Sequence, residues 1–174
     1  MGKLTQILYG ALLFLGIGLQ GLVAEERITS YDVDIVIEQD GELVVTETIS
    51  VVAEHKKIKR GIYRDFPTTY KDRYGNRVRV AYDVTRVLKD GSPEKYFNKN
   101  KSNGVRTYIG EKSKFVSVGP HEYSITYKTN RQIGFFAEHD ELYFNAIPHG
   151  FEFPIQKARV TVYLPAAIPN HDLI

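Results

Sequence analysis

The sequence predicts an all-β protein, a single immunoglobulin-like β-sandwich of roughly eight to ten strands preceded by a signal peptide. Three observations lead to this prediction. Apolar and polar residues alternate in many segments, clusters of turn residues separate these segments, and no segment after residue 24 has the apolar spacing of an amphipathic helix.

The first 24 residues have the pattern of a secretory signal peptide. Lys3 gives a positive start, residues 7–19 form an uncharged run, and the small residue Ala24 precedes Glu25. The alternative is an uncleaved membrane anchor, because the uncharged stretch can be extended to residues 4–23. The short apolar core and the small residue at its exit favour export followed by cleavage.

The remaining chain suits one domain. We expect this domain at residues 25–166 and the start of a linker at residues 167–174, on the extracytoplasmic face of the cell membrane, in the periplasm or at the cell surface. A chain of this size can bury a sizeable core. The sequence contains no cysteine, so an exported domain must rely on packing rather than on disulfides.

The first two strands are predicted around the turn at Asp40-Gly41. Residues 31–37 alternate between apolar and polar, and Asp-Gly between alternating runs is a strong hairpin signal. In the return strand, Glu47 falls on the same face as the apolar side chains. A lone carboxylate on such a face is unfavourable unless it is paired and hydrogen-bonded.

We expect Arg64 to be the partner of Glu47. Arg64 lies in residues 61–67, a segment with a turn glycine, a charged pair and two aromatic residues, and Arg60 is the other nearby cation. A planar guanidinium can bind a carboxylate through two parallel hydrogen bonds. The pair is interpreted as a buried structural contact that fixes the loop against the sheet; the alternative is a ligand site.

Further strands are predicted by the same alternation of residues. The turns between them include Asp90-Gly91-Ser92-Pro93 and Gly119-Pro120. The predicted strands cover residues 78–84, 105–109, 114–118, 123–127, 142–146 and 158–164.

Charge is distributed unevenly along the chain. Residues 56–114 contain 17 Lys and Arg against 6 Asp and Glu, whereas the flanks contain an excess of acidic residues. Such a region could bind anionic envelope polymers or lipid head groups. We favour the alternative, in which basic and acidic strands lie side by side in one sheet and pair their charges. The candidate contact residues are Lys56, Lys57, Lys59 and Arg60.

No catalytic motif accompanies these features, and neither a metal nor another cofactor is expected. The five histidines are scattered, and the side chains of consecutive strand residues such as His139 and Asp140 point to opposite faces. Paired carboxylates for an envelope hydrolase could be assembled from Glu47, Asp65 or Glu141, but any β protein offers such pairs. The predicted export argues against nucleic acid as a partner. The weaker candidates for an exposed polar binding rim are Asp65, Asp140, Glu141 and Asn145.

Five short motifs occur in an order that resembles a known family. The motifs are Tyr31-Asp32-Val33 before the Asp40-Gly41 turn, Val45-Thr46-Glu47-Thr48-Ile49, Gly61-Ile62-Tyr63-Arg64-Asp65, Gly119-Pro120-His121-Glu122-Tyr123 and Asp140-Glu141-Leu142-Tyr143-Phe144-Asn145. In these motifs the chain resembles the N-terminal extracytoplasmic domain of YciQ-like predicted bacterial membrane proteins, over about residues 27–165.

The resemblance implies an architecture more than an activity. Members of the family have a signal peptide, this β domain outside the membrane and then transmembrane helices, and they supply no catalytic residues to carry over. Phe144 stands where the family pattern usually has tryptophan, and residues 147–150 replace a shorter turn. The expected function is a non-catalytic binding or interaction domain, associated with the membrane through a region beyond residue 174 and contacting a protein partner or an anionic envelope polymer.

Overall fold

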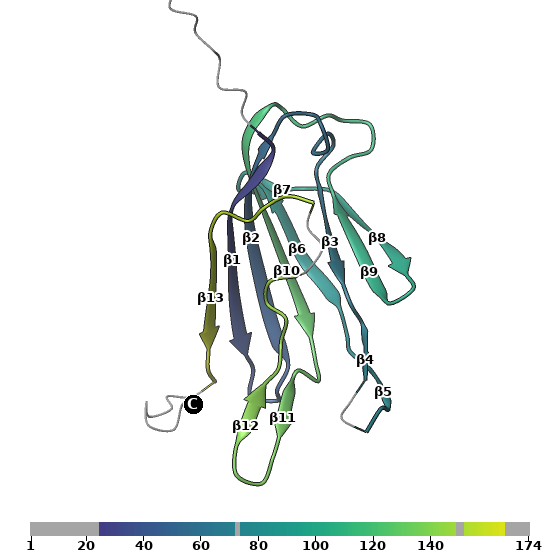
Figure 1. Ribbon diagram of the computed structural model, residues 1–174, viewed down its shortest axis with the longest axis vertical. Helices are drawn as coiled ribbons and strands as arrows, with labels where there is room; N and C mark the ends of the chain where they lie inside the picture. Colours follow the sequence, from purple (N-terminus) through teal and green to yellow (C-terminus); the bar gives the residue numbers. More distant parts are fainter. Residues whose placement is uncertain (1–24, 72–73, 149–151, 166–174) are drawn as a thin grey trace, which may run out of the picture.

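The computed structural model describes residues 25–71, 74–148 and 152–165, which form thirteen strands (Figure 1). The predicted all-β class is confirmed, because no residue in these ranges is helical. Accordingly, none of these residues belongs to a helix that could span a membrane. The predicted signal peptide and the predicted linker lie outside the described residues.

The largest sheet has six strands in the order β13-β1-β2-β10-β6-β7. All neighbouring strands are antiparallel except β13, which runs parallel to β1. The strands of this sheet are β1 (Arg27–Ile37), β2 (Leu43–Ala53), β6 (Asp83–Lys89), β7 (Ser92–Pro93), β10 (Gly119–Thr129) and β13 (Ala158–Tyr163).

A second sheet of three strands has the order β3-β9-β8, and two short hairpins complete the fold. Figure 1 shows the second sheet beside the β10 and β6 side of the main sheet. The strands are β3 (Ile62–Phe66), β8 (Tyr96–Lys101) and β9 (Gly104–Ile109) in the sheet, and β4 (Thr69–Lys71), β5 (Arg77–Arg79), β11 (Ile133–Phe135) and β12 (Asp140–Leu142) in the hairpins.

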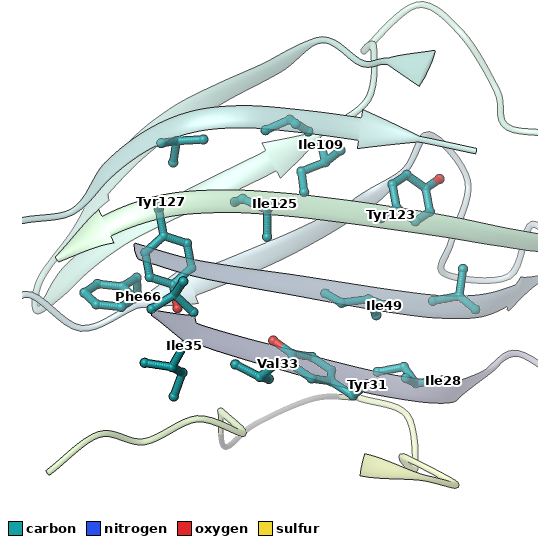
Figure 2. Packing of buried hydrophobic residues seen from close by; sticks show 14 of the residues in the cluster. Ile28, Tyr31, Val33, Ile35, Ile49, Phe66, Ile109, Tyr123, Ile125 and Tyr127 are labelled. Atoms are coloured by element: carbon teal, nitrogen blue, oxygen red, sulfur yellow. The ribbon is translucent and has the colours of Figure 1, made fainter. Parts of the chain in front are cut away.

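The core lies between the two sheets, because strands of both contribute to it. Phe66 of β3 and Ile109 of β9 belong to the same buried cluster as residues of the main sheet, and the rings of Phe66 and Tyr127 meet edge to face at 5.2 Å (Figure 2). The main sheet contributes the inward-facing members of its alternating strands, including Tyr31, Val33, Ile35, Leu43, Val45, Ile49, Tyr123, Ile125 and Tyr127. Two layers packed face to face are a sandwich-like arrangement.

Some predicted strands differ from the structure. The predicted strand at residues 114–118 is wrong: these residues form an irregular connection, in which the Val116 N–H donates to the Lys59 carbonyl oxygen rather than to a neighbouring strand. The strand predicted at residues 78–84 is divided between β5 and β6, and the strand predicted at residues 142–146 ends at Leu142. The structure has more strands than predicted because it includes pairs of only two or three residues.

Gly61 permits the close approach of β3 to β9. Its φ is 124°, and a Cβ atom there would lie 1.8 Å from the backbone oxygen of Ile109. We expect Gly61→Ala to lower the free energy of unfolding by at least about 2 kcal/mol, because it adds a backbone clash to an unfavourable φ. Urea unfolding followed by circular dichroism measures this change.

Gly75→Ala is the matched control. Gly75 also has a positive φ, 81°, but a Cβ atom there would meet no atom within 4 Å. The control therefore tests the cost of φ alone and should lose less stability than Gly61→Ala. Equal losses in the two variants would contradict the role given to the contact with Ile109.

Candidate functional site

Glu47 and Arg64 form a buried ion pair between the two sheets. Glu47 lies in the middle of β2 and is 0% exposed, and Arg64 of β3 is 2% exposed. Arg64 Nε donates to Glu47 Oε2 at 2.6 Å, and Arg64 Nη2 donates to Oε1 at 2.8 Å. The structure thus brings together the two residues that the sequence pairs, in the two-bond geometry that a guanidinium and a carboxylate favour.

Two tyrosines complete the surroundings of the carboxylate. The Tyr31 hydroxyl of β1 donates to Glu47 Oε2, and the Tyr127 hydroxyl of β10 donates to Oε1 at 2.5 Å. Arg64 also donates through Nη1 to the carbonyl oxygen of Asp65. Each carboxylate oxygen therefore accepts one hydrogen bond from the arginine and one from a tyrosine, so that four strands meet at one buried charge.

The electrostatics of this cluster keep the two tyrosines and the arginine each in one protonation state. Burial and the neighbouring Glu47 carboxylate raise the pKa of both Tyr31 and Tyr127 far above the ordinary value. Burial acts to lower the pKa of Arg64, but the Glu47 carboxylate outweighs it and raises that pKa. The tyrosines therefore stay neutral donors and the arginine stays charged at any physiological pH.

Tyr31 and Tyr127 lie in the segments at residues 31–37 and 123–127 for which the sequence predicts strands, but no sequence signal above assigns them to this cluster. The signal that could have identified them is their phase: Tyr31 and Tyr127 fall on the inward face of β1 and β10, the strands that flank β2. A tyrosine in that position brings a hydroxyl that needs a partner when it is buried.

Glu26 organises the basic loop at residues 54–58. Its buried carboxylate accepts hydrogen bonds from the backbone N–H groups of Glu54, Lys56, Lys57 and Ile58, at 2.7–3.2 Å. Burial raises the pKa of Glu26, but the four backbone donors outweigh it and hold the pKa below its ordinary value. The loop is therefore folded around a negative charge supplied by the chain itself.

Asp65 is held by Arg106 of the neighbouring strand. Arg106 Nε donates to Asp65 Oδ1 at 2.6 Å, and Nη2 donates to Oδ2 at 2.5 Å. The hydrogen bonds from Arg106 lower the pKa of Asp65. Asp65 thus lies in a surface ion pair on the opposite face of β3 from Arg64.

Ser117, His121 and Asp90 lie in an order that resembles a catalytic triad. Ser117 Oγ is 3.1 Å from His121 Nε2, and His121 Nδ1 is 2.9 Å from Asp90 Oδ2. However, His121 Nε2 also lies 2.8 Å from the carbonyl oxygen of Ser117, which can only accept a hydrogen bond. That nitrogen is therefore shared between the serine hydroxyl and the serine's own carbonyl oxygen, whereas the base of a catalytic triad is hydrogen-bonded to the hydroxyl that it activates. The contacts among these three residues hold the irregular connection at residues 114–118, which precedes β10, in place.

The remaining candidates lie in two separate places. Asp140 and Glu141 are exposed on β12, and Glu141 and Asn145 both line a hollow of about 710 Å³ beside the β11–β12 hairpin. The basic candidates are all exposed on the loop before β3. Lys57 pairs with Glu152 at 2.9 Å, and Arg60 lies 4.3 Å from the centre of the Phe115 ring.

Within the described ranges, no three His, Asp or Glu side chains are grouped so that they could hold a metal ion.

Comparisons with known proteins match the chain to one family. A family model described as "Predicted membrane protein (DUF2207) N-terminal domain" matches residues 27–172. The uncharacterized protein YciQ of Escherichia coli (strain K12) is 28% identical over 138 residues, which are 79% of this chain and 22% of YciQ. The chain therefore spans about a fifth of the length of this curated relative.

Similar solved structures are distant. Native yeast LTA4 hydrolase shares 15% sequence identity, with 62% of this chain and 15% of that chain covered and a TM-score of 0.45. The M1 zinc metallopeptidase from Deinococcus radiodurans shares 12% identity, with 62% of this chain and 21% of that chain covered and a TM-score of 0.38. Likenesses of this size carry no argument about fold or function.

The buried pair predicts non-additive effects of mutation. We expect Glu47→Gln to lower the free energy of unfolding by about 3–5 kcal/mol, because it leaves Arg64 charged and unpaired in the core. Adding Arg64→Met should recover part of that loss, since two uncharged side chains of similar size replace the pair. Urea unfolding of both single variants and of the double variant measures the coupling, and strictly additive losses would contradict it.

The lowered pKa of Glu26 predicts that this residue makes a pH-dependent contribution to the stability of the fold. Because its pKa is lower in the folded chain than in the unfolded chain, Glu26 stabilises the fold above about pH 4 and loses this effect as the pH falls. We expect Glu26→Gln to melt below the unmodified chain at pH 7, with the difference shrinking as the pH falls through 4. A melting-temperature difference that stays constant from pH 7 to pH 3 would contradict this role.

Proposed function

The chain belongs to the predicted membrane protein (DUF2207) N-terminal domain family, and from this premise we propose that it is a non-catalytic binding or interaction domain held on the extracytoplasmic face of the membrane. The observation that carries the proposal is the state of its most deeply buried charges. Glu47 is fully enclosed and accepts four hydrogen bonds from the chain itself. A carboxylate in that state stabilises the fold and cannot reach a substrate.

The alternative of an envelope hydrolase has little support. Such an enzyme needs carboxylates that converge with a proton-transfer group in one cleft. Glu47 is enclosed, Asp65 is paired with Arg106, and Glu141 lies on a hairpin apart from both. Across residues 25–71, 74–148 and 152–165, no hydrogen bond joins any of these three carboxylates to a histidine.

The position outside the membrane is proposed from the sequence. The pattern of residues 1–24 favours export, and the family description supports a membrane protein. In this arrangement the domain meets either a protein partner or the anionic polymers and lipid head groups of the cell envelope.

A second candidate function, electrostatic attachment, is favoured by the basic loop. Lys56, Lys59 and Arg60 are exposed and take part in no ion pair with the described part of the chain. Glu26 fixes the backbone of residues 54–58, so Lys56 projects from a held segment, and Lys59 and Arg60 follow directly after it. Exposed cations of this kind attract anionic polymers and surfaces, and salt weakens that attraction.

Binding across a salt series tests this candidate. We expect the purified chain to bind an anionic polymer or anionic lipid vesicles, with affinity falling at least about ten-fold as salt rises from about 50 to about 200 mM. Replacing Lys56, Lys57, Lys59 and Arg60 by alanine should weaken binding at low salt.

The control variant removes the same number of positive charges elsewhere on the chain. It carries alanine at Lys128, Arg131, Lys157 and Arg159 and should keep most of the affinity. Equal losses in both variants would mean that net charge alone decides binding. Absence of binding at low salt would remove electrostatic attachment and leave a protein partner as the proposed ligand.

A further inference from the structure

The outer face of the three-stranded sheet carries a row of aromatic rings. Tyr63 of β3 is in register with Tyr108 of β9, which is in register with Phe97 of β8. The ring centres of Tyr63 and Tyr108 are 6.2 Å apart, and those of Tyr108 and Phe97 are 4.8 Å apart and stacked. All three side chains are partly exposed, so this row is reachable from solvent.

The row faces outward because alternate residues of the same strands face the core. Arg64 and Thr107 are buried neighbours of Tyr63 and Tyr108 in the chain, and side chains alternate along a strand. Since the inward residues are fixed by the Glu47 cluster and the core, the rings cannot turn inward. They form a fixed platform across three strands.

Positive charge surrounds this aromatic row. The Arg106 guanidinium lies 3.8 Å from the centre of the Tyr63 ring, and Lys112 Nζ lies 4.6 Å from the centre of the Phe97 ring. The acidic groups nearby are already paired, Asp65 with Arg106 and Glu111 with Lys95. The charge of Arg106 is therefore balanced by Asp65, whereas Lys112 forms no ion pair with the described residues.

A groove of about 510 Å³ joins the rings to further cations. Tyr63, Phe97 and Tyr108 line it together with Lys59, Lys99 and Lys112. None of these lysines takes part in an ion pair with the described residues. A ligand in the groove would meet aromatic side chains and ammonium groups together.

We propose that this groove binds an acidic polysaccharide, a chain of sugar rings bearing carboxylate or phosphate groups. The apolar faces of sugar rings pack against the exposed parts of Tyr63, Tyr108 and Phe97, while the acidic groups pair with Lys59, Lys99 and Lys112. The inference rests on the proposed binding function and names its ligand class and its site.

The arrangement favours a glycan over a lipid surface. The three rings stand in a row across neighbouring strands, and a row suits an extended chain. Its rings lie in a sheet face and are only partly exposed, whereas insertion into a bilayer needs apolar side chains that protrude. Charge alone would serve a lipid head group equally well, but it gives no role to three aligned rings.

The test compares probes that differ in sugar rings and in charge. Calorimetric titration of the purified chain at about 50 mM salt uses alginate oligosaccharides, polyglutamate of matched charge, oligothymidylate and vesicles containing phosphatidylglycerol. We expect alginate to bind more tightly than polyglutamate and the vesicles. Tighter binding of oligothymidylate or of the vesicles than of alginate would overturn the proposal.

Variants locate the binding to the ring platform. We expect the double variant Phe97→Leu, Tyr108→Leu to bind alginate about five-fold more weakly, because it loses ring stacking, and to bind polyglutamate as before. The control Phe135→Leu removes an exposed ring on β11 and should bind as the unmodified chain does. The double variant Lys99→Ala, Lys112→Ala should bind both alginate and polyglutamate more weakly.

The outcomes separate this inference from the proposed function. Unchanged alginate binding by the leucine double variant would overturn the ring platform while leaving electrostatic binding intact, whereas no binding of any polyanion would count against both. If the double variant does not fold, as judged by its circular dichroism, the lysine variant and Phe97→Tyr replace it. Phe97→Tyr keeps the ring and should keep the affinity, and a loss equal to that of Lys99→Ala with Lys112→Ala would overturn stacking.

Discussion

The structure depends on the burial of one carboxylate with all of its hydrogen-bonding capacity filled. Glu47 stands in the middle of β2, where an ionised group without partners would be highly unfavourable. Arg64 supplies the opposite charge, and the hydroxyls of Tyr31 and Tyr127 fill the remaining positions. Because the four side chains come from β1, β2, β3 and β10, this contact fixes the relative position of the two sheets.

Because side chains alternate along β3 and β9, the same strands contribute residues both to the buried cluster and to the outer surface. Arg64 points to the buried cluster, while Tyr63 and Asp65, its neighbours in the chain, lie on the outer face with Arg106 and Tyr108. A shift of register by one residue would place the guanidinium in solvent and the acidic residue in the core. The cluster therefore also determines which side chains form the outer surface.

The parts of the structure that can be predicted from the sequence are those governed by local periodicity. Residues 31–51 show a clear period of two around an Asp-Gly turn, which places Glu47 on the inward face and makes Arg64 the partner of choice. Residues 114–118 also alternate, but a period of two cannot show whether a neighbouring strand is available. In the structure that segment forms hydrogen bonds with the ring of His121 and the backbone of Lys59 instead. The contact of Asp90 with His121 joins residues far apart in the chain, so no local sequence pattern predicts it.

The parallel pairing of β13 with β1 has a mechanical consequence. These are the first and last strands of the described chain, and six register pairs from Tyr31–Ala158 to Val36–Tyr163 join them. Because they run in the same direction, β1 begins at one end of the molecule and β13 ends at the other (Figure 1). Tension applied to the two ends of the domain would slide one strand along the other and load all of these hydrogen bonds together, instead of opening them one after another. A domain pulled at these two ends would therefore hold its fold under load.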